Sequence, residues 1–82
     1  MKYDQDKVDE MTLALLFLVT TESEFGARAG RSFDMATMTR LHKKGWIDDP
    51  KTKALSLLLT KEGFERSQDL FSKHFRDEEE KK

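Results

Sequence analysis

The chain has 82 residues, enough for one small domain with a modest core. It contains no cysteine, which excludes disulfide bonds, thiol catalysis and thiolate metal sites. Charged residues make up 38% of the chain and the net charge is −1. We therefore expect a highly charged folded domain over residues 1–76 and a disordered charged tail over residues 77–82.

The charge is unevenly distributed along the chain. Residues 25–61 contain eight Lys or Arg and three Asp, whereas the segments on either side are acidic. A basic middle third favours a polyanionic partner such as double-stranded DNA. An ordinary solvated surface explains it equally well, because Lys and Arg are common on helix surfaces.

Neither the N-terminal residues nor the apolar runs of the sequence indicate a membrane protein. The first residues are acidic, whereas a secretory signal begins with basic residues and then becomes apolar. The longest apolar run, residues 13–19, is far shorter than the roughly 20 residues needed to span a bilayer. The sequence predicts a cytoplasmic protein without a membrane partner.

A first helix is expected after an N-terminal cap at Asp4 or Asp6. One stripe of this helix repeats at helical spacing and consists of Val8, Met11, Leu15 and Leu18. The second half of the helix is apolar nearly all round, and such a helix needs cover on more than one side. We expect it either to be the central core helix of a monomer or to be shared in a homodimer.

Residues 22–31 form a glycine-containing connection that includes Phe25, Arg28 and Arg31. Two glycines beside two arginines resemble a phosphate-binding loop. The Gly-Lys-Ser/Thr ending of such a loop is missing, and no strand is expected before it. We therefore expect a short helix or turn here.

The next helix is predicted over residues 35–44, between a cap at Asp34 and Gly45, a residue type that commonly ends helices. Met38 and Leu41 would face the core. The opposite, exposed face with its border would carry Thr37, Arg40, Lys43 and Lys44. Basic side chains in a last helical turn also stabilise the helix dipole, and that role requires no partner.

Residues 46–59 predict a β-hairpin. Trp46 begins a short strand, a turn follows around Pro50, and residues 54–59 return as a second strand with alternating leucines. The expected tip of this hairpin carries Lys51 and Lys53. Two adjacent aspartates at its base would oppose the close approach of a phosphate.

A last helix is expected after a cap at Thr60, with Phe64, Phe71 and Phe75 in its apolar stripe. Aromatic residues on a final helix more often form a core or a dimer surface than a platform for stacking bases. The first and last helices together give the candidate dimer or partner surface, which comprises Leu13, Leu16, Phe17, Phe71 and Phe75.

Residues suited to enzyme chemistry are scarce. His42 and His74 are far apart, and neither has a second His at the spacing of a metal site. The serines lack the glycines of a nucleophile elbow. The sequence predicts no catalytic residue, no metal and no cofactor.

Two motifs carry a resemblance to a known fold: Leu-x-x-x-Gly-aromatic-Ile at residues 41–47 and Leu-Thr-x-Glu-Gly at residues 59–63. With them, residues 33–75 resemble the recognition helix, wing and closing helix of MarR- and PadR-type transcription regulators. The resemblance implies a small α+β, mostly α, domain of winged-helix type. Its elements would be a helix, a short helix or turn, a helix, a two-stranded β-hairpin wing and a C-terminal helix. The stretch before Asp34 is short and glycine-rich for a full second helix.

The winged-helix resemblance also implies a DNA interface. Arg40 would contact base edges, since bidentate pairing of Arg with guanine is the commonest specific contact, and Lys43 and Lys44 would contact phosphates. The expected nucleic-acid-binding residues are Arg28, Arg31, Thr37, Arg40, Lys43, Lys44, Lys51 and Lys53.

A second resemblance covers most of the chain. It rests on the opening residues 1–9, on Phe-Gly-Ala-Arg-Ala at residues 25–29, and on residues 33–34 leading to Arg-Leu-His-x-Lys-Gly-Trp-Ile at 40–47. These segments are similar to a family of short bacterial proteins described only as a domain of unknown function. The resemblance implies a bacterial origin and supplies no activity.

Two functions are expected as alternatives. The first is a small DNA-binding regulator, dimeric through its first and last helices, and the basic middle third slightly favours it. The second is a non-enzymatic protein-interaction module on a degenerate winged-helix scaffold, favoured by the near-zero net charge and by Asp48 and Asp49.

Overall fold

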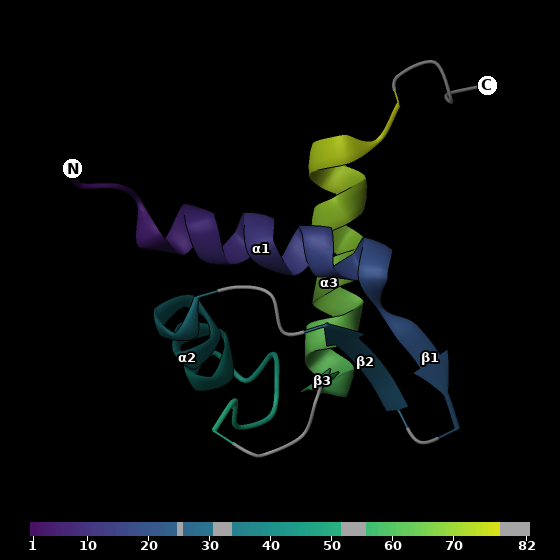
Figure 1. The fold of residues 1–82 in the computed structure, drawn as a ribbon. Helices are drawn as coiled ribbons and strands as arrows, with labels where there is room; N and C mark the ends of the chain where they lie inside the picture. The colour runs from purple at the N-terminus through teal and green to yellow at the C-terminus, as the bar shows by residue number, and fades with distance from the viewer. Residues whose placement is uncertain (25, 31–33, 52–55, 78–82) are drawn as a thin grey trace.

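A computed structural model describes residues 1–24, 26–30, 34–51 and 56–77 of the chain. It is a small α+β domain, mostly helical, with three helices and a three-stranded antiparallel sheet among these residues (Figure 1). In chain order the elements are α1 (Gln5–Val19), β1 (Thr21–Ser23), β2 (Gly26–Gly30), α2 (Met35–Lys43), β3 (Ser56–Leu59) and α3 (Lys61–Phe75).

The N-terminal caps expected from the sequence are confirmed. The Asp4 carboxylate accepts a hydrogen bond from the Lys7 N–H at 3.1 Å, and thereby begins α1. Asp34 and Thr60 cap α2 and α3 in the same way, each through a side-chain oxygen bonded to the N–H three residues later. Each cap satisfies a backbone donor that has no partner within its helix.

The prediction of a short helix or turn over residues 22–31 is wrong, because β1 and β2 form an antiparallel hairpin there. Ala27 and Ala29 are buried while Arg28 between them is exposed, which is the alternation of a strand with one buried face. Gly26 at the turn has a φ of +118°, a conformation that favours glycine. Phe25 and Arg31 lie outside the described residues.

The predicted wing is present only in part. Ile47 forms an isolated antiparallel bridge with Leu59, and the Asp48 N–H donates to the Leu58 carbonyl at 2.9 Å. The strand partner of β3 is instead β2, and the sheet order is β1-β2-β3. The buried Leu57 and Leu59 alternate with half-buried neighbours, as expected. The tip of the predicted wing, residues 52–55, lies outside the described residues.

The described residues contain no helix between α1 and α2. Between α1 and β3 the described residues contain one helix, α2, and the β1–β2 hairpin occupies the segment where a short helix or turn was expected. The mostly helical α+β class is therefore confirmed, whereas a winged-helix arrangement is not.

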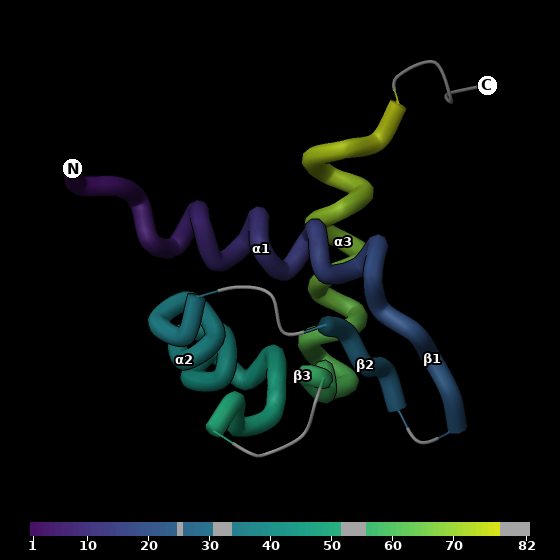
Figure 2. The backbone as a smooth tube through the Cα atoms, in the orientation of Figure 1, coloured from purple at the N-terminus to yellow at the C-terminus, as the bar shows by residue number. Residues whose placement is uncertain are grey.

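The core is formed where α1 crosses α3 above the sheet. Figure 2 shows this crossing, and the buried faces of both helices meet there. Leu13, Ala14 and Leu16 are fully buried on α1 and pack with Leu70 of α3. The remaining core residues come from the sheet, from α2 and from the bridge that follows it: Ala27, Ala29, Met38, Leu41, Trp46, Ile47, Leu57 and Leu59.

The start of α3 lies directly against the backbone at the end of α2. The Thr60 N–H donates to the Trp46 carbonyl at 3.0 Å, and its hydroxyl donates to the Gly45 carbonyl at 2.6 Å. A Cβ added at Gly63 would overlap the Trp46 carbonyl. Glycine at position 63 therefore allows the close approach that fixes where α3 begins.

Candidate functional site

Arg40 of α2 and Lys44 at its C-terminal cap pair with carboxylates of α1. Arg40 Nε donates to both carboxylate oxygens of Asp9, at 2.8 and 3.0 Å, and Lys44 Nζ lies 3.0 Å from Asp9 Oδ2. Lys44 also donates to Asp6 at 3.0 Å. Asp9 is completely buried, and a buried carboxylate requires such partners because its desolvation is costly. We call Asp9, Arg40 and Lys44 the α1–α2 ion cluster.

The expectation of an exposed Thr37, Arg40 and Lys44 stripe is therefore wrong. Thr37 is 2% exposed, and its hydroxyl donates to the Asp34 carboxylate at 2.8 Å. Arg40 Nη2 donates to the Thr37 hydroxyl at 3.2 Å. A continuous chain of polar contacts thus runs from the α2 cap to the buried Asp9 on α1.

These contacts shift the pKa values of Arg40, Lys44 and Asp34 in the direction that favours the charged form of each group. The hydrogen bond to Asp9 raises the pKa of Arg40. Burial lowers the pKa of Lys44, but its hydrogen bonds to Asp6 and Asp9 outweigh burial, and the net pKa is raised. Hydrogen bonds from the Thr37 side chain and backbone lower the pKa of Asp34. The cationic partners of the α1–α2 ion cluster stay charged at neutral pH.

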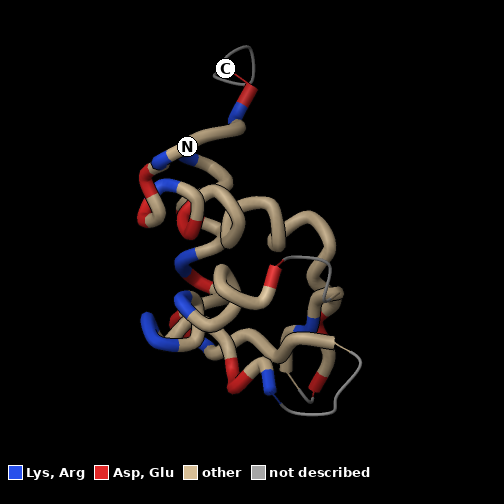
Figure 3. Tube along the Cα trace, turned by 60° about the vertical axis from the view of Figure 1, so that its left-hand side comes forward, with Lys and Arg blue, Asp and Glu red and all other residues tan. Residues whose placement is uncertain are grey.

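Three of the other candidate nucleic-acid residues lie in the described part of the chain. Lys43, Lys51 and Arg28 are exposed, and Arg28 donates to the Ser56 hydroxyl at 3.1 Å. Figure 3 shows Lys and Arg interspersed with Asp and Glu along the described trace. Arg31 and Lys53 lie outside the described residues.

Two members of the candidate dimer surface are in the monomer core. Leu13 and Leu16 are each 0% exposed, so the expectation that they form an intermolecular surface is wrong. Phe17 and Phe71 are half-buried, and their rings lie 5.2 Å apart between α1 and α3. Phe75 is 40% exposed and continues this aromatic row, with its ring 5.4 Å from that of Phe71.

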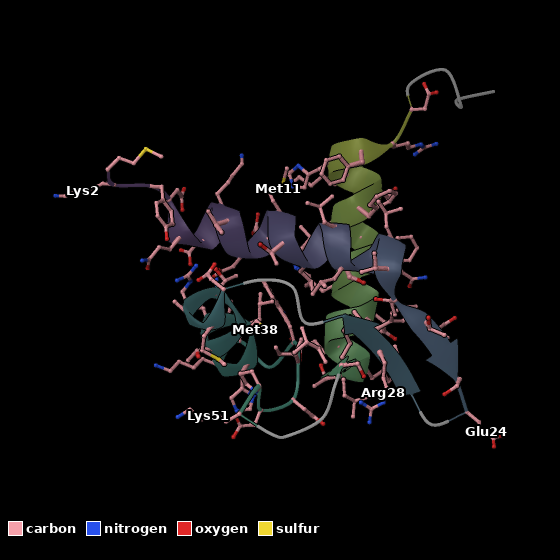
Figure 4. All side chains as sticks on the ribbon, in the orientation of Figure 1. Lys2, Met11, Glu24, Arg28, Met38 and Lys51 are labelled. Atoms are coloured by element: carbon pink, nitrogen blue, oxygen red, sulfur yellow. The ribbon has the colours of Figure 1, made fainter. Side chains whose placement is uncertain are left out.

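The exposed apolar surface of α1 lies on its opposite side. Leu15 is 42% exposed, Leu18 is 64% exposed and Val19 is 58% exposed. Met11, one turn earlier, is half-buried, and Figure 4 places it on the side of α1 away from α2. We call Met11, Leu15, Leu18 and Val19 the α1 apolar face. It contains most of the stripe that the sequence marks at helical spacing.

An open groove of about 490 Å³ adjoins the C-terminal end of α1. Its lining comes from one residue of α1 and from α3 with its C-terminal cap: Phe17, Gln68, Phe71, Ser72 and Arg76. Two aromatic rings and one cationic side chain therefore lie together where the C-terminal end of α1 meets α3. Such a groove can accept an apolar side chain that is accompanied by an anionic group.

The described residues offer little for other chemistry. They contain no group of three His, Asp or Glu side chains placed to hold a metal ion. Among the described helices, none is both long enough and apolar enough to cross a membrane. His74 Nε2 is buried without a hydrogen-bond partner in the described part of the chain.

Comparison with known proteins identifies a family and one relative. Residues 4–77 match the family model described as a domain of unknown function, DUF6429. The chain is 49% identical over 75 residues to the uncharacterized protein y4hR of Sinorhizobium fredii (strain NBRC 101917 / NGR234), covering 92% of this chain and 97% of that protein. No solved structure matches the chain.

Proposed function

This chain belongs to the DUF6429 family of domains of unknown function, and from its structure we propose that it is a non-enzymatic protein-interaction module that binds its partner through the α1 apolar face. The observation that carries the proposal is the exposure of Leu15, Leu18 and Val19 on adjacent turns of one helix. Single exposed apolar residues are normal on a protein surface, whereas a contiguous group marks an interaction site.

Fully burying a Leu or Val side chain contributes about 1.5–3 kcal/mol, and α1 withholds three such side chains from the core of the monomer. The opposite face of the same helix is completely buried at Leu13 and Leu16. The core of the monomer therefore covers one side of α1, and a partner would cover the other side.

Double-stranded DNA is the second candidate partner. The observation in its favour is that Lys43 and Lys51 are exposed in the basic middle third. Against it, Arg40 and Lys44 pair with carboxylates of α1, so neither is free to contact bases or phosphates. Titration with a mixed-sequence duplex at low salt tests this candidate, because phosphate contacts weaken steeply as salt rises. Binding that is lost in a Lys43→Ala, Lys51→Ala variant would support it.

The proposed function is tested by photo-cross-linking in living cells of the native host. A photoreactive amino acid replaces Leu18 in one variant of the full chain and Met35 in a matched control, since Met35 is also exposed, at 48%, but lies on α2. We expect protein adducts from position 18 and none from position 35. No adduct at position 18, or equal adducts at both positions, would contradict the proposal.

A further inference from the structure

We infer that the open groove where the C-terminal end of α1 meets α3 is a binding site for a small aromatic carboxylate, held with its ring against Phe17 and Phe71 and its carboxylate on Arg76. This inference goes beyond the proposed function, because the groove is lined by no residue of the α1 apolar face. It is carried by the combination of an aromatic wall with polar side chains that have no partner among the described residues.

The apolar wall of the groove is a pair of aromatic rings. Phe17 of α1 and Phe71 of α3 are half-buried, and their ring centroids lie 5.2 Å apart with an angle of 39° between the ring planes. Each ring therefore contacts the other while part of its surface stays open to solvent. Aromatic rings favour offset or tilted contacts at centroid distances of about 4.5–7 Å. The ring of a ligand can extend this arrangement.

The polar wall of the groove lies along α3 and its C-terminal cap. Gln68, Ser72 and Arg76 line it at intervals of four positions, so they follow one face of the helix. All three side chains are exposed. Within residues 1–24, 26–30, 34–51 and 56–77, none of them takes part in a hydrogen bond or an ion pair. Their donors are therefore available to a ligand.

Arg76 sets the charge of the ligand. Among the described residues that line the groove, it alone is charged. Its guanidinium presents parallel N–H donors that match the two oxygens of a carboxylate. Asp69 and Asp77, next in the chain to Gln68 and Arg76, are exposed but do not line the groove, and the C-terminal end of a helix carries partial negative charge. These surroundings disfavour a dianion such as a phosphate monoester and leave a monoanion as the matching ligand.

The dimensions of the groove fit a small molecule. Its volume of about 490 Å³ lies within the range of about 300–1,000 Å³ that is typical of small-molecule sites. Phe71 and Arg76 are five positions apart, which corresponds to roughly 7.5 Å along the helix axis. A phenyl ring joined to a carboxylate by a short linker spans this separation, because the Arg76 side chain can reach toward it.

An amide NMR titration of the full chain tests the site, with hydrocinnamate as the probe at neutral pH. Hydrocinnamate is a phenyl ring joined to a carboxylate by two methylene groups, and a ligand of this size should bind an open groove with a dissociation constant of about 1 mM. The largest shifts should fall on the lining residues: Phe17, Gln68, Phe71, Ser72 and Arg76. The amides of α2 should not shift.

Two matched probes separate the contributions of the two walls. Hydrocinnamamide has the same ring without the charge, and should bind about tenfold more weakly because it cannot form a charge-assisted hydrogen bond with Arg76. Propionate has the charge without the ring, and should give no saturable shift up to about 20 mM, since it cannot contact the aromatic wall.

Arg76→Gln should raise the dissociation constant of hydrocinnamate about tenfold and change that of hydrocinnamamide less than about twofold, because the charge is lost and the aromatic wall is kept. Lys73→Gln is the matched control, since Lys73 is also an exposed cation in the last turn of α3 but does not line the groove. It should change neither constant more than about twofold. Both side chains are exposed, and unchanged circular dichroism will verify that both variants fold.

The results that would overturn the inference are distinct. The absence of a saturable shift in the wild type up to about 20 mM hydrocinnamate, roughly twentyfold above the expected dissociation constant, excludes the site. Equal affinity for hydrocinnamate and hydrocinnamamide, or equal losses in Arg76→Gln and Lys73→Gln, shows that Arg76 does not select the ligand. Tighter binding of phenyl phosphate than of hydrocinnamate assigns the groove to phosphate monoesters instead. Because the α1 apolar face is tested by cross-linking at position 18, failure of either proposal leaves the other standing.

Discussion

Replacing the buried Asp9 by Asn should destabilise the fold far more than the same replacement at Asp6. Both carboxylates contact Lys44 Nζ at 3.0 Å, but the Asp9 side chain is 0% exposed and the Asp6 side chain is 86% exposed. The two variants therefore remove the same charge near the same partner at two different depths. Asp6→Asn is the matched control.

The expected magnitude follows from what each change leaves behind. Removing one partner of a buried ion pair costs about 3–5 kcal/mol, because the remaining charge is uncompensated. Here the remaining side chains, Arg40 and Lys44, are 20% and 30% exposed, so water compensates part of the loss. We expect Asp9→Asn to lose about 2–3 kcal/mol and Asp6→Asn less than about 0.5 kcal/mol. The larger loss is a substantial part of the stability of a small domain, about 5–15 kcal/mol.

Urea denaturation followed by tryptophan fluorescence measures both losses. Trp46 is the single tryptophan of the chain and is 8% exposed in the core, so its emission reports unfolding of the same region. Equal losses for Asp9→Asn and Asp6→Asn would refute the reasoning, because they would mean that burial of the carboxylate does not decide its contribution.

Three further predictions concern the caps, the packing and the exposed face. Gly63→Ala should lower the free energy of unfolding by about 3 kcal/mol or more, because its methyl group would overlap the Trp46 carbonyl. A thermal midpoint within roughly two degrees of that of the wild type would contradict this prediction, because a loss of that size shifts the midpoint of a small domain much further. Hydrogen bonds from the Thr37 side chain and backbone hold the pKa of Asp34 below its ordinary value of 3.8. Asp34 therefore stabilises the fold above that pKa and loses this contribution as the pH falls below it. The urea midpoint of the wild type should drop more between about pH 5 and about pH 2 than that of Asp34→Asn, which keeps a capping side chain that does not titrate; parallel pH profiles would contradict the assignment. The double variant Leu15→Ser, Leu18→Ser should keep the wild-type free energy of unfolding within about 0.5 kcal/mol at sub-micromolar concentration, because both side chains are exposed in the monomer. A larger loss in urea denaturation would place them in the core.

The sequence predicted the features that local chemistry decides. Asp4 or Asp6, Asp34 and Thr60 are predicted as caps because a short polar side chain before an apolar helical pattern has few other roles; of the first two, Asp4 is the cap. The α1 stripe was identified by its spacing. The β1–β2 hairpin was missed because its buried face consists of Ala27 and Ala29, whose alternation with Arg28 is too weakly apolar to mark a strand.

The ion pairing of α2 could not be read from α2 alone. Arg40 and its partner Asp9 are separated by 31 positions in the chain, and periodicity within one helix says nothing about a contact at that separation. One signal was present on α1. Asp9 precedes Leu13 by four residues and Leu16 by seven, so it lies on the same face as two apolar residues of the core. An acid in line with a buried face predicts a cation facing it from a neighbouring element.

The sheet also has a consequence for how the protein behaves when concentrated. The backbone groups of an unpaired edge strand attract strands from other molecules and can lead to fibres. Here the outer strand β1 has three residues and carries the exposed Glu22, and at the other edge the bridge from Ile47 covers Leu59 of β3. Growth by strand addition is therefore opposed at both edges, by shortness and charge at one and by cover at the other. We expect concentrated solutions of the protein to remain free of thioflavin-positive fibres.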